Sequence, residues 1–155
     1  MLAKARILAL LVPALLLGGA LGSQYLGGLV PCEMCMWQRY PHYTALGLAI
    51  LAILLAKTAL SRPLTMLAGL AILVSGGLGI FHAGVEYRWW KGPEHCTSVV
   101  SGSGADLLKA ILAAPLVRCD QPQWTMFGIS LAGYNAIFSI LGGLAVLYLC
   151  LRPSR

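Results

Sequence analysis

The residues of this chain with the clearest chemistry are two cysteines, Cys32 and Cys35, which are separated by two residues. A dithiol at this spacing can close into a small disulfide ring and open again, and such pairs often have a lowered thiolate pKa. Arg39 follows Cys35 by four residues, so the two side chains share a face if this segment is helical. A neighbouring cation and a helix N-terminus would both favour negative charge on Cys35. The segment therefore predicts a redox-active dithiol.

The elements that position this dithiol are predicted from the composition, which is that of a membrane protein. Hydrophobic residues make up 59% of the 155 residues and charged residues 10%. The apolar residues lie in long uncharged runs, and about 20 such residues suffice to cross a bilayer. We predict an all-α membrane protein, a four-transmembrane-helix bundle forming one domain over residues 1–155. Its spans are expected at about residues 7–28, 41–57, 63–85 and 124–151, with the first retained and not cleaved as a signal peptide.

Positive charge lies on one side of this predicted bundle. Three short segments beside the spans hold bases and no acids: Lys4 and Arg6, Lys57 and Arg62, and Arg152 and Arg155. They account for the net charge of +6, because acids and bases balance in the two remaining segments. The positive-inside rule therefore predicts cytoplasmic termini and two outer loops, at about residues 24–41 and 86–124. The bases anchor the spans and form no patch, which excludes nucleic-acid binding.

Four cysteines, Cys32, Cys35, Cys96 and Cys119, fall in the outer loops, where disulfides persist. A zinc ribbon needs two Cys-x2-Cys halves, and the Cys-x22-Cys spacing of the second pair does not match. We therefore predict no metal site. Purely structural disulfides are an alternative, but a Cys-x-x-Cys closes almost no loop and stabilises a fold little. Cys150, near the cytoplasmic end of the last run, is predicted to be a reduced thiol facing the membrane.

The second outer loop is predicted to carry a short helix of its own. Ser103 and Asp106 have the spacing of a capping box, and an amphipathic stretch continues from there to Pro115. Such a helix is expected to lie on the membrane surface, where its apolar stripe is buried among lipids.

The third and fourth predicted spans contain small and polar residues with expected roles. Glycines recur along the third span and predict close helix packing. His82 lies near the outer end of that span, and an ionisable group at membrane depth is a candidate functional residue. Asn135, in the fourth span, is expected to form a hydrogen bond between helices.

Together these motifs resemble the DsbB family of bacterial inner-membrane proteins that generate disulfide bonds. The resemblance covers nearly the whole chain. It rests on Pro31-Cys-x-x-Cys35 with Arg39, on the His82-x-Gly84-Val-Glu86 run leading to Cys96, and on Cys119-Asp120 with Trp124, Gly128 and Asn135.

The resemblance implies a protein-disulfide oxidoreductase of the bacterial inner membrane with two periplasmic loops. Its partners would be a DsbA-like periplasmic dithiol protein and the membrane quinone pool. Carried over by position, Cys96 is attacked by the partner's thiolate, and Cys119 is released. Cys119 then attacks Cys32, and Cys35 faces the quinone.

The resemblance also implies which residues hold the quinone. Arg39 is expected to bind a quinone oxygen, and His82 falls where the family's quinone pocket has a histidine. Both ubiquinone and menaquinone fit this prediction, as do a general and a dedicated DsbA-like partner. Two alternatives are a vitamin K epoxide reductase-like quinone reductase, whose Cys-x-x-Cys lies on a late span, and a non-catalytic membrane scaffold with structural disulfides.

Overall fold

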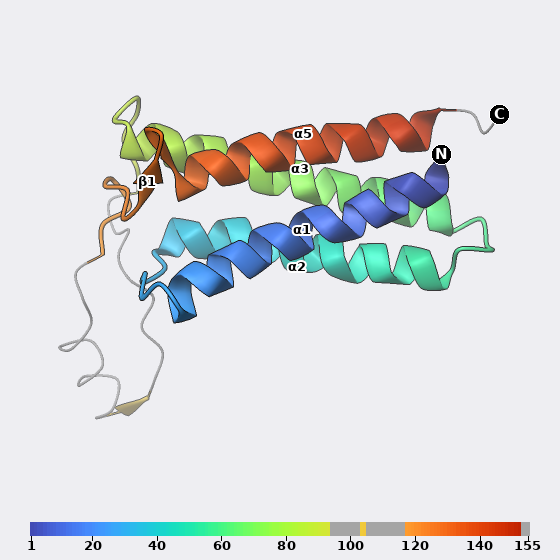
Figure 1. Ribbon diagram of the computed structural model, residues 1–155, viewed down its shortest axis with the longest axis horizontal. Helices are drawn as coiled ribbons and strands as arrows, with labels where there is room; N and C mark the ends of the chain where they lie inside the picture. The colour runs from blue at the N-terminus through green and yellow to red at the C-terminus, as the bar shows by residue number, and fades with distance from the viewer. Residues whose placement is uncertain (94–102, 105–116, 153–155) are drawn as a thin grey trace.

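The computed structural model describes residues 1–93, 103–104 and 117–152, and this part of the chain forms a bundle of long helices (Figure 1). The start of the first helix and the end of the last helix lie at one end of the bundle, and the connection between the first two helices lies at the other. The helices are α1 (Leu2–Tyr25), α2 (Glu33–Leu54), α3 (Ser61–Glu86) and α5 (Leu131–Leu151), and the strands are β1 (Thr125–Met126) and β2 (Ile129–Ser130).

Three of these helices, α1, α3 and α5, are long and apolar enough to cross a membrane. α2 is not among them, because its first half contains Glu33, Gln38, Arg39 and His42. The all-helical membrane class is confirmed, whereas the second span predicted at residues 41–57 stays a prediction.

The boundaries of α2 differ from the prediction. We expected an outer loop at about residues 24–41, but α2 begins at Glu33 and Pro41 lies inside it. The reason is that Cys32 caps the helix, since its side chain accepts a hydrogen bond from the backbone of Cys35. The second cysteine of the dithiol is therefore helical. The short surface helix predicted around residues 103–115 falls almost entirely outside the described residues.

A two-stranded antiparallel hairpin precedes α5, within the region predicted as the start of the last span. Its turn residues Phe127 and Gly128 both have positive φ, as a tight hairpin turn requires. The hydroxyl of Tyr87 donates to the carbonyl of Gly128 at 2.8 Å and accepts from the backbone N–H of Ser130 at 2.9 Å. These bonds hold the hairpin at the end of α3.

α3 and α5 pack closely through glycines, as predicted for the third span. Gly69 lies against Val146, and a methyl group added at Gly79 would stand 3.0 Å from the backbone nitrogen of Ala136. Such close approach brings the polar groups of the two helices within hydrogen-bonding distance. Cys150 is a free thiol, as predicted, but it is buried in the bundle among small residues such as Ala5 and does not face the membrane.

Candidate functional site

The predicted dithiol lies at the N-terminus of α2. Cys32 and Cys35 are both free thiols, and their sulfur atoms are 2.8 Å apart. The backbone N–H of Cys35 donates to the sulfur of Cys32 at 3.2 Å, so the first turn of the helix fixes the position of Cys32. Two sulfurs held this close can exchange a hydrogen bond for a disulfide without rearrangement of the helix.

The two thiols are electrostatically different. The hydrogen bond from the Cys32 thiol to Cys35 lowers the pKa of Cys35, and the same bond together with burial raises the pKa of Cys32. Arg39 adds a smaller effect that also lowers the pKa of Cys35. Cys35 is therefore the more acidic thiol of the pair, as expected, and the largest cause is the hydrogen bond from Cys32, not the arginine.

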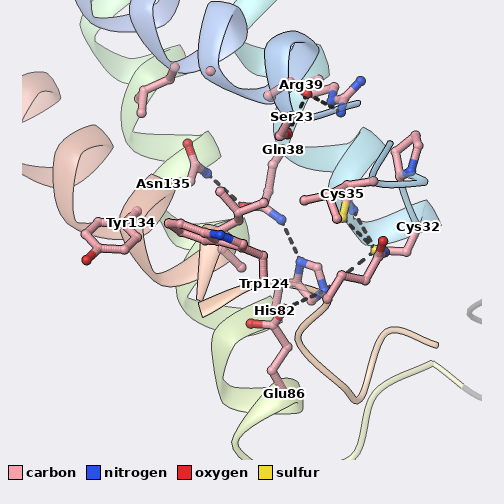
Figure 2. A pocket seen from close by; sticks show the side chains of 18 of the residues that line it. Ser23, Cys32, Cys35, Gln38, Arg39, His82, Glu86, Trp124, Tyr134 and Asn135 are labelled. Carbon is pink, nitrogen blue, oxygen red and sulfur yellow. Dashed lines mark hydrogen bonds and ion pairs between the residues drawn. The ribbon is translucent and has the colours of Figure 1, made fainter. Parts of the chain in front are cut away.

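His82 lies between the dithiol and the second cysteine segment (Figure 2). Its Nε2 is 3.7 Å from the sulfur of Cys32 and 3.8 Å from a carboxylate oxygen of Glu86. The ring also forms a hydrogen bond with the backbone of Cys119. The carboxylate of Glu86 in turn accepts from the hydroxyl of Ser130, the residue that caps α5.

Cys119 is disulfide-bonded and packs in the same buried cluster as Cys32. Met34, Val85 and Val117 complete this cluster. The structure thus places one cysteine of the second predicted pair in the same buried cluster as the first cysteine of the dithiol. Cys96 lies outside the described residues.

The side chain of Arg39, on α2, forms hydrogen bonds with α1. Its guanidinium donates to the side-chain oxygen of Gln24 at 2.6 Å and to the backbone carbonyl of Ala20 at 3.2 Å. The side chain is only 8% exposed, and no carboxylate pairs with it in the described part of the chain. A buried cation paired only with neutral oxygens keeps its capacity to bind an anionic or strongly polar ligand.

A cavity of about 200 Å³ lies between the helices and brings these residues together. Cys32, Cys35, Arg39 and His82 all line it, and Figure 2 shows them around one space with Trp124 and Tyr134. Apolar side chains form much of the remaining wall, mainly Leu15, Leu16, Leu17, Leu29, Val30 and Leu131. The site is an apolar pocket with a thiolate, a cation and a histidine at its wall.

A buried polar network that was not predicted supports this wall. The side-chain nitrogen of Gln38 donates to Nδ1 of His82 at 2.8 Å, and its oxygen accepts from Asn135 at 2.8 Å. The oxygen of Asn135 accepts from Nε2 of His42 at 2.9 Å. The interhelical bond predicted for Asn135 is thus confirmed, whereas Gln38 and His42 were missed, although their i,i+4 spacing on α2 was a signal.

The thiols and His82 also have the spacing of metal ligands. The sulfurs of Cys32 and Cys35 and Nε2 of His82 lie within 4.8 Å of one another. A metal-bound histidine normally donates its other ring N–H to an acceptor. Here Nδ1 of His82 faces an N–H of Gln38, whose same nitrogen donates to the backbone carbonyl of Met34 at 3.1 Å. Nε2 therefore carries the ring proton, which favours thiol chemistry over metal binding.

Comparison with known proteins agrees with this arrangement. The model of the family described as "Disulfide bond formation protein DsbB" matches residues 3–149. The chain is 30% identical to "Disulfide bond formation protein B" of Polaromonas sp., over 97% of this chain and 92% of that protein. It is 31% identical to the protein of the same name from Acidovorax sp., over 99% and 91%, and 31% identical to that from Polaromonas naphthalenivorans, over 90% and 86%. No solved structure matches. This chain therefore belongs to the DsbB family of disulfide bond formation proteins.

Proposed function

We propose that this protein oxidises a DsbA-like periplasmic dithiol protein and passes the electrons to a membrane quinone. It acts in the bacterial inner membrane as a four-span bundle with cytoplasmic termini. The observation that carries the proposal is the apolar cavity, whose wall holds the Cys35 thiolate and the Arg39 guanidinium beside the Cys119 segment.

The first exchange takes place at the second pair of cysteines. The partner's thiolate attacks Cys96, forms an intermolecular disulfide and releases Cys119 as a thiolate. The support for this step is that Cys119 is disulfide-bonded. The partner then leaves oxidised once its second thiol resolves the mixed disulfide.

The second exchange carries the electrons to the dithiol of α2. When Cys32 and Cys35 form a disulfide, the released Cys119 attacks Cys32, with which it shares a buried cluster. Attack on this sulfur expels Cys35, and a leaving thiol of low pKa leaves faster. The lowered pKa of Cys35 therefore directs the attack to Cys32 and leaves the negative charge beside the cavity. The Cys96 thiolate then attacks Cys119 in the Cys32–Cys119 disulfide, which re-forms the Cys96–Cys119 bond and releases Cys32 as the second thiol of the reduced dithiol.

A quinone fits the residues that line this cavity. The wall is mostly apolar, as a membrane-soluble ring needs, and Arg39 offers N–H donors suited to a ring oxygen. When bound, a quinone supplies an acceptor for two electrons and two protons. Such an acceptor is needed because a DsbA-type carrier, with a potential of roughly −120 mV, is more oxidising than ordinary structural disulfides, as known for the DsbA–DsbB–quinone system.

Quinone reduction by the purified protein in liposomes, supplied with a reduced DsbA-like partner, tests the proposal. We expect turnover in the native protein and none in Cys96→Ala or Cys35→Ala. Cys150→Ala is the matched control, since Cys150 lies away from the cavity, and its turnover should stay within about twofold of native. Turnover that persists in Cys35→Ala would contradict the relay. A native protein that reduces no quinone and exchanges no disulfide with the partner would favour the scaffold alternative.

A further inference from the structure

His42 is a buried histidine of the cavity wall that the proposed relay does not use. It lies on α2 one turn beyond Arg39, is 2% exposed and lines the cavity. Its Nδ1 is the one buried side-chain nitrogen or oxygen without a hydrogen-bond partner among the described residues. An unfilled buried polar atom costs free energy and calls for an explanation.

The protonation of His42 follows from the backbone carbonyl of Ser75, which can only accept hydrogen bonds. The carbonyl of Ser75 accepts from the side chain of Asn135 at 3.2 Å, so the atom of Asn135 that faces it is the NH₂ nitrogen. The oxygen of Asn135 then faces Nε2 of His42 at 2.9 Å, and Nε2 must carry the proton. In the neutral ring, Nδ1 is consequently a bare acceptor.

The oxidised and reduced forms of a quinone differ in hydrogen-bond donors, and a bare acceptor such as Nδ1 of His42 can bind only a donor. The two carbonyl oxygens of a quinone only accept hydrogen bonds, whereas the two hydroxyls of a hydroquinone also donate. Arg39 has only donors, and Nδ1 of His42 is only an acceptor. The cavity wall therefore contains one group that binds either form through an oxygen and another that binds only the form carrying O–H.

We propose that Nδ1 of His42 accepts a hydrogen bond from a hydroxyl of the hydroquinone, so that this cavity binds the reduced ring more tightly than the oxidised one. This inference rests on the proposed function and deepens it. Because the ring is only 2% exposed, the ligand meets Nδ1 when the wall yields slightly around it, and filling the empty acceptor offsets that shift.

The chemistry balances without a further reactant. Cys32 and Cys35 lose two electrons and two protons and form a disulfide, and the two ring carbonyls become hydroxyls. Preferential binding of the hydroquinone favours this direction, since the product form gains a hydrogen bond that the substrate form cannot make. His42 thus acts as a binding residue for the product and exchanges no electrons.

Two substitutions separate the acceptor from the supporting network. His42→Gln places an amide nitrogen near Nε2 and keeps a donor to Asn135, but it leaves no acceptor near Nδ1. His42→Asn places an oxygen near Nδ1 and loses the donor to Asn135. Both are made in a Cys32→Ser, Cys35→Ser background, so that no electrons are exchanged. Cooperative thermal unfolding of each variant verifies that it is folded.

Binding is measured under anaerobic conditions with a short-chain benzoquinone and, separately, with its hydroquinone. The readout is quenching of tryptophan fluorescence, since Trp124 lines the cavity. We expect the ratio of the quinone Kd to the hydroquinone Kd to fall about tenfold in His42→Gln and to stay within about threefold of the background in His42→Asn.

Each other outcome decides a different point. An unchanged ratio in His42→Gln would overturn the role of His42 while leaving the quinone site intact. A ratio lost in both variants would also overturn it, because the donor to Asn135 would then set the preference. Failure of both ligands to bind the background protein would overturn the quinone site itself and this inference with it.

Discussion

The asymmetry between Cys32 and Cys35 arises from the geometry of a single helix start. Cys32 caps α2, and its thiol lies 2.8 Å from the sulfur of Cys35, to which it can donate. This bond lowers the pKa of Cys35, which lines the same cavity as Arg39. The helix cap thus makes the two sulfurs unequal, and in the proposed relay Cys35 is the leaving group and Cys32 is the sulfur that is attacked.

Alkylation of Cys35 tests this asymmetry. Only the thiolate reacts, so a pKa lowered from the ordinary 9.0 moves the midpoint of the rate–pH curve to lower pH. In reduced protein, Cys32→Ala removes the donor and should move this midpoint up by about one pH unit. Cys32→Ser is the matched control, since its hydroxyl can still donate, and its midpoint should stay close to native. Equal midpoints in the two variants would show that Cys32 does not support the thiolate.

Arg39 is expected to act on the quinone and not on thiol exchange. Arg39→Lys keeps the charge but replaces a fork of N–H donors with a compact ammonium group. The KM for the quinone should rise about tenfold, while the rate of disulfide exchange with the DsbA-like partner stays near native. Gln24→Ala controls for loss of the contact with α1, since it removes a partner of Arg39 and leaves the guanidinium. A KM raised equally in both variants would assign the effect to packing.

The sequence was sufficient to predict the reactive residues, but not the polar side chains that form hydrogen bonds around them. Cys32, Cys35, Arg39 and His82 carry unusual chemistry in an apolar chain, and the structure places all four around one cavity. His42 was missed because its role depends on the faces that α2 and α5 turn to each other. Such helix rotations are set by packing between segments far apart in the chain.

At the scale of elements, close packing of α3 on α5 keeps the polar network intact. Asn135 of α5 donates to the backbone of Ser75 in α3 and to Gln38 in α2, so it joins three helices. These bonds require α3 and α5 to approach closely, which the glycines permit. Repeated glycines in an apolar run were sufficient to predict close packing of the third span, but they did not indicate that α5 is its partner.

Substitution of two neighbouring glycines tests the packing. Gly79→Ala places a methyl group 3.0 Å from the backbone of Ala136, where no side chain can move away, and should cost about 1–3 kcal/mol. Gly77→Ala is the matched control, because nothing lies within 4 Å of its added methyl group. Its stability should be unchanged or slightly raised. Titration with a denaturing detergent measures both, and equal loss in the two variants would contradict the packing argument.

The boundaries of elements followed from contacts that hydropathy does not report. α2 begins at Glu33 because a cysteine caps it, although cysteine is not among the usual capping residues. The hairpin before α5 is held by the hydroxyl of Tyr87, which comes from another helix. The sequence prediction assigned the hairpin residues to the last span, because they directly precede a long apolar run.

At the scale of the whole molecule, the number of membrane crossings depends on α2. α2 is less apolar than α1, α3 and α5, which are apolar enough to cross a membrane. Its polar side chains Gln38 and Arg39 are nevertheless buried inside the bundle. Most of its exposed side chains are apolar or aromatic, including Ile50 and Leu54, and the hydroxyl of exposed Thr44 donates to the backbone carbonyl of Tyr40. A helix with polar groups inside and apolar groups outside suits contact with lipid on its outer face. The internal hydrogen bonds thus explain how α2 can cross despite its composition.

The number of membrane crossings can be tested, because the start of α1 and the end of α5 lie at the same end of the bundle in Figure 1. Four crossings return the chain to its starting side, whereas three would leave the C-terminus on the opposite side. The bases near both ends predict that this side is the cytoplasm. Green fluorescent protein fused after Arg155 should therefore fluoresce, and so should a fusion after Lys57. Alkaline phosphatase fused after Gly92 should be active. An active phosphatase fused after Arg155, with a cytoplasmic N-terminus, would mean that α2 does not cross, and the dithiol could not then face the same compartment as Cys119.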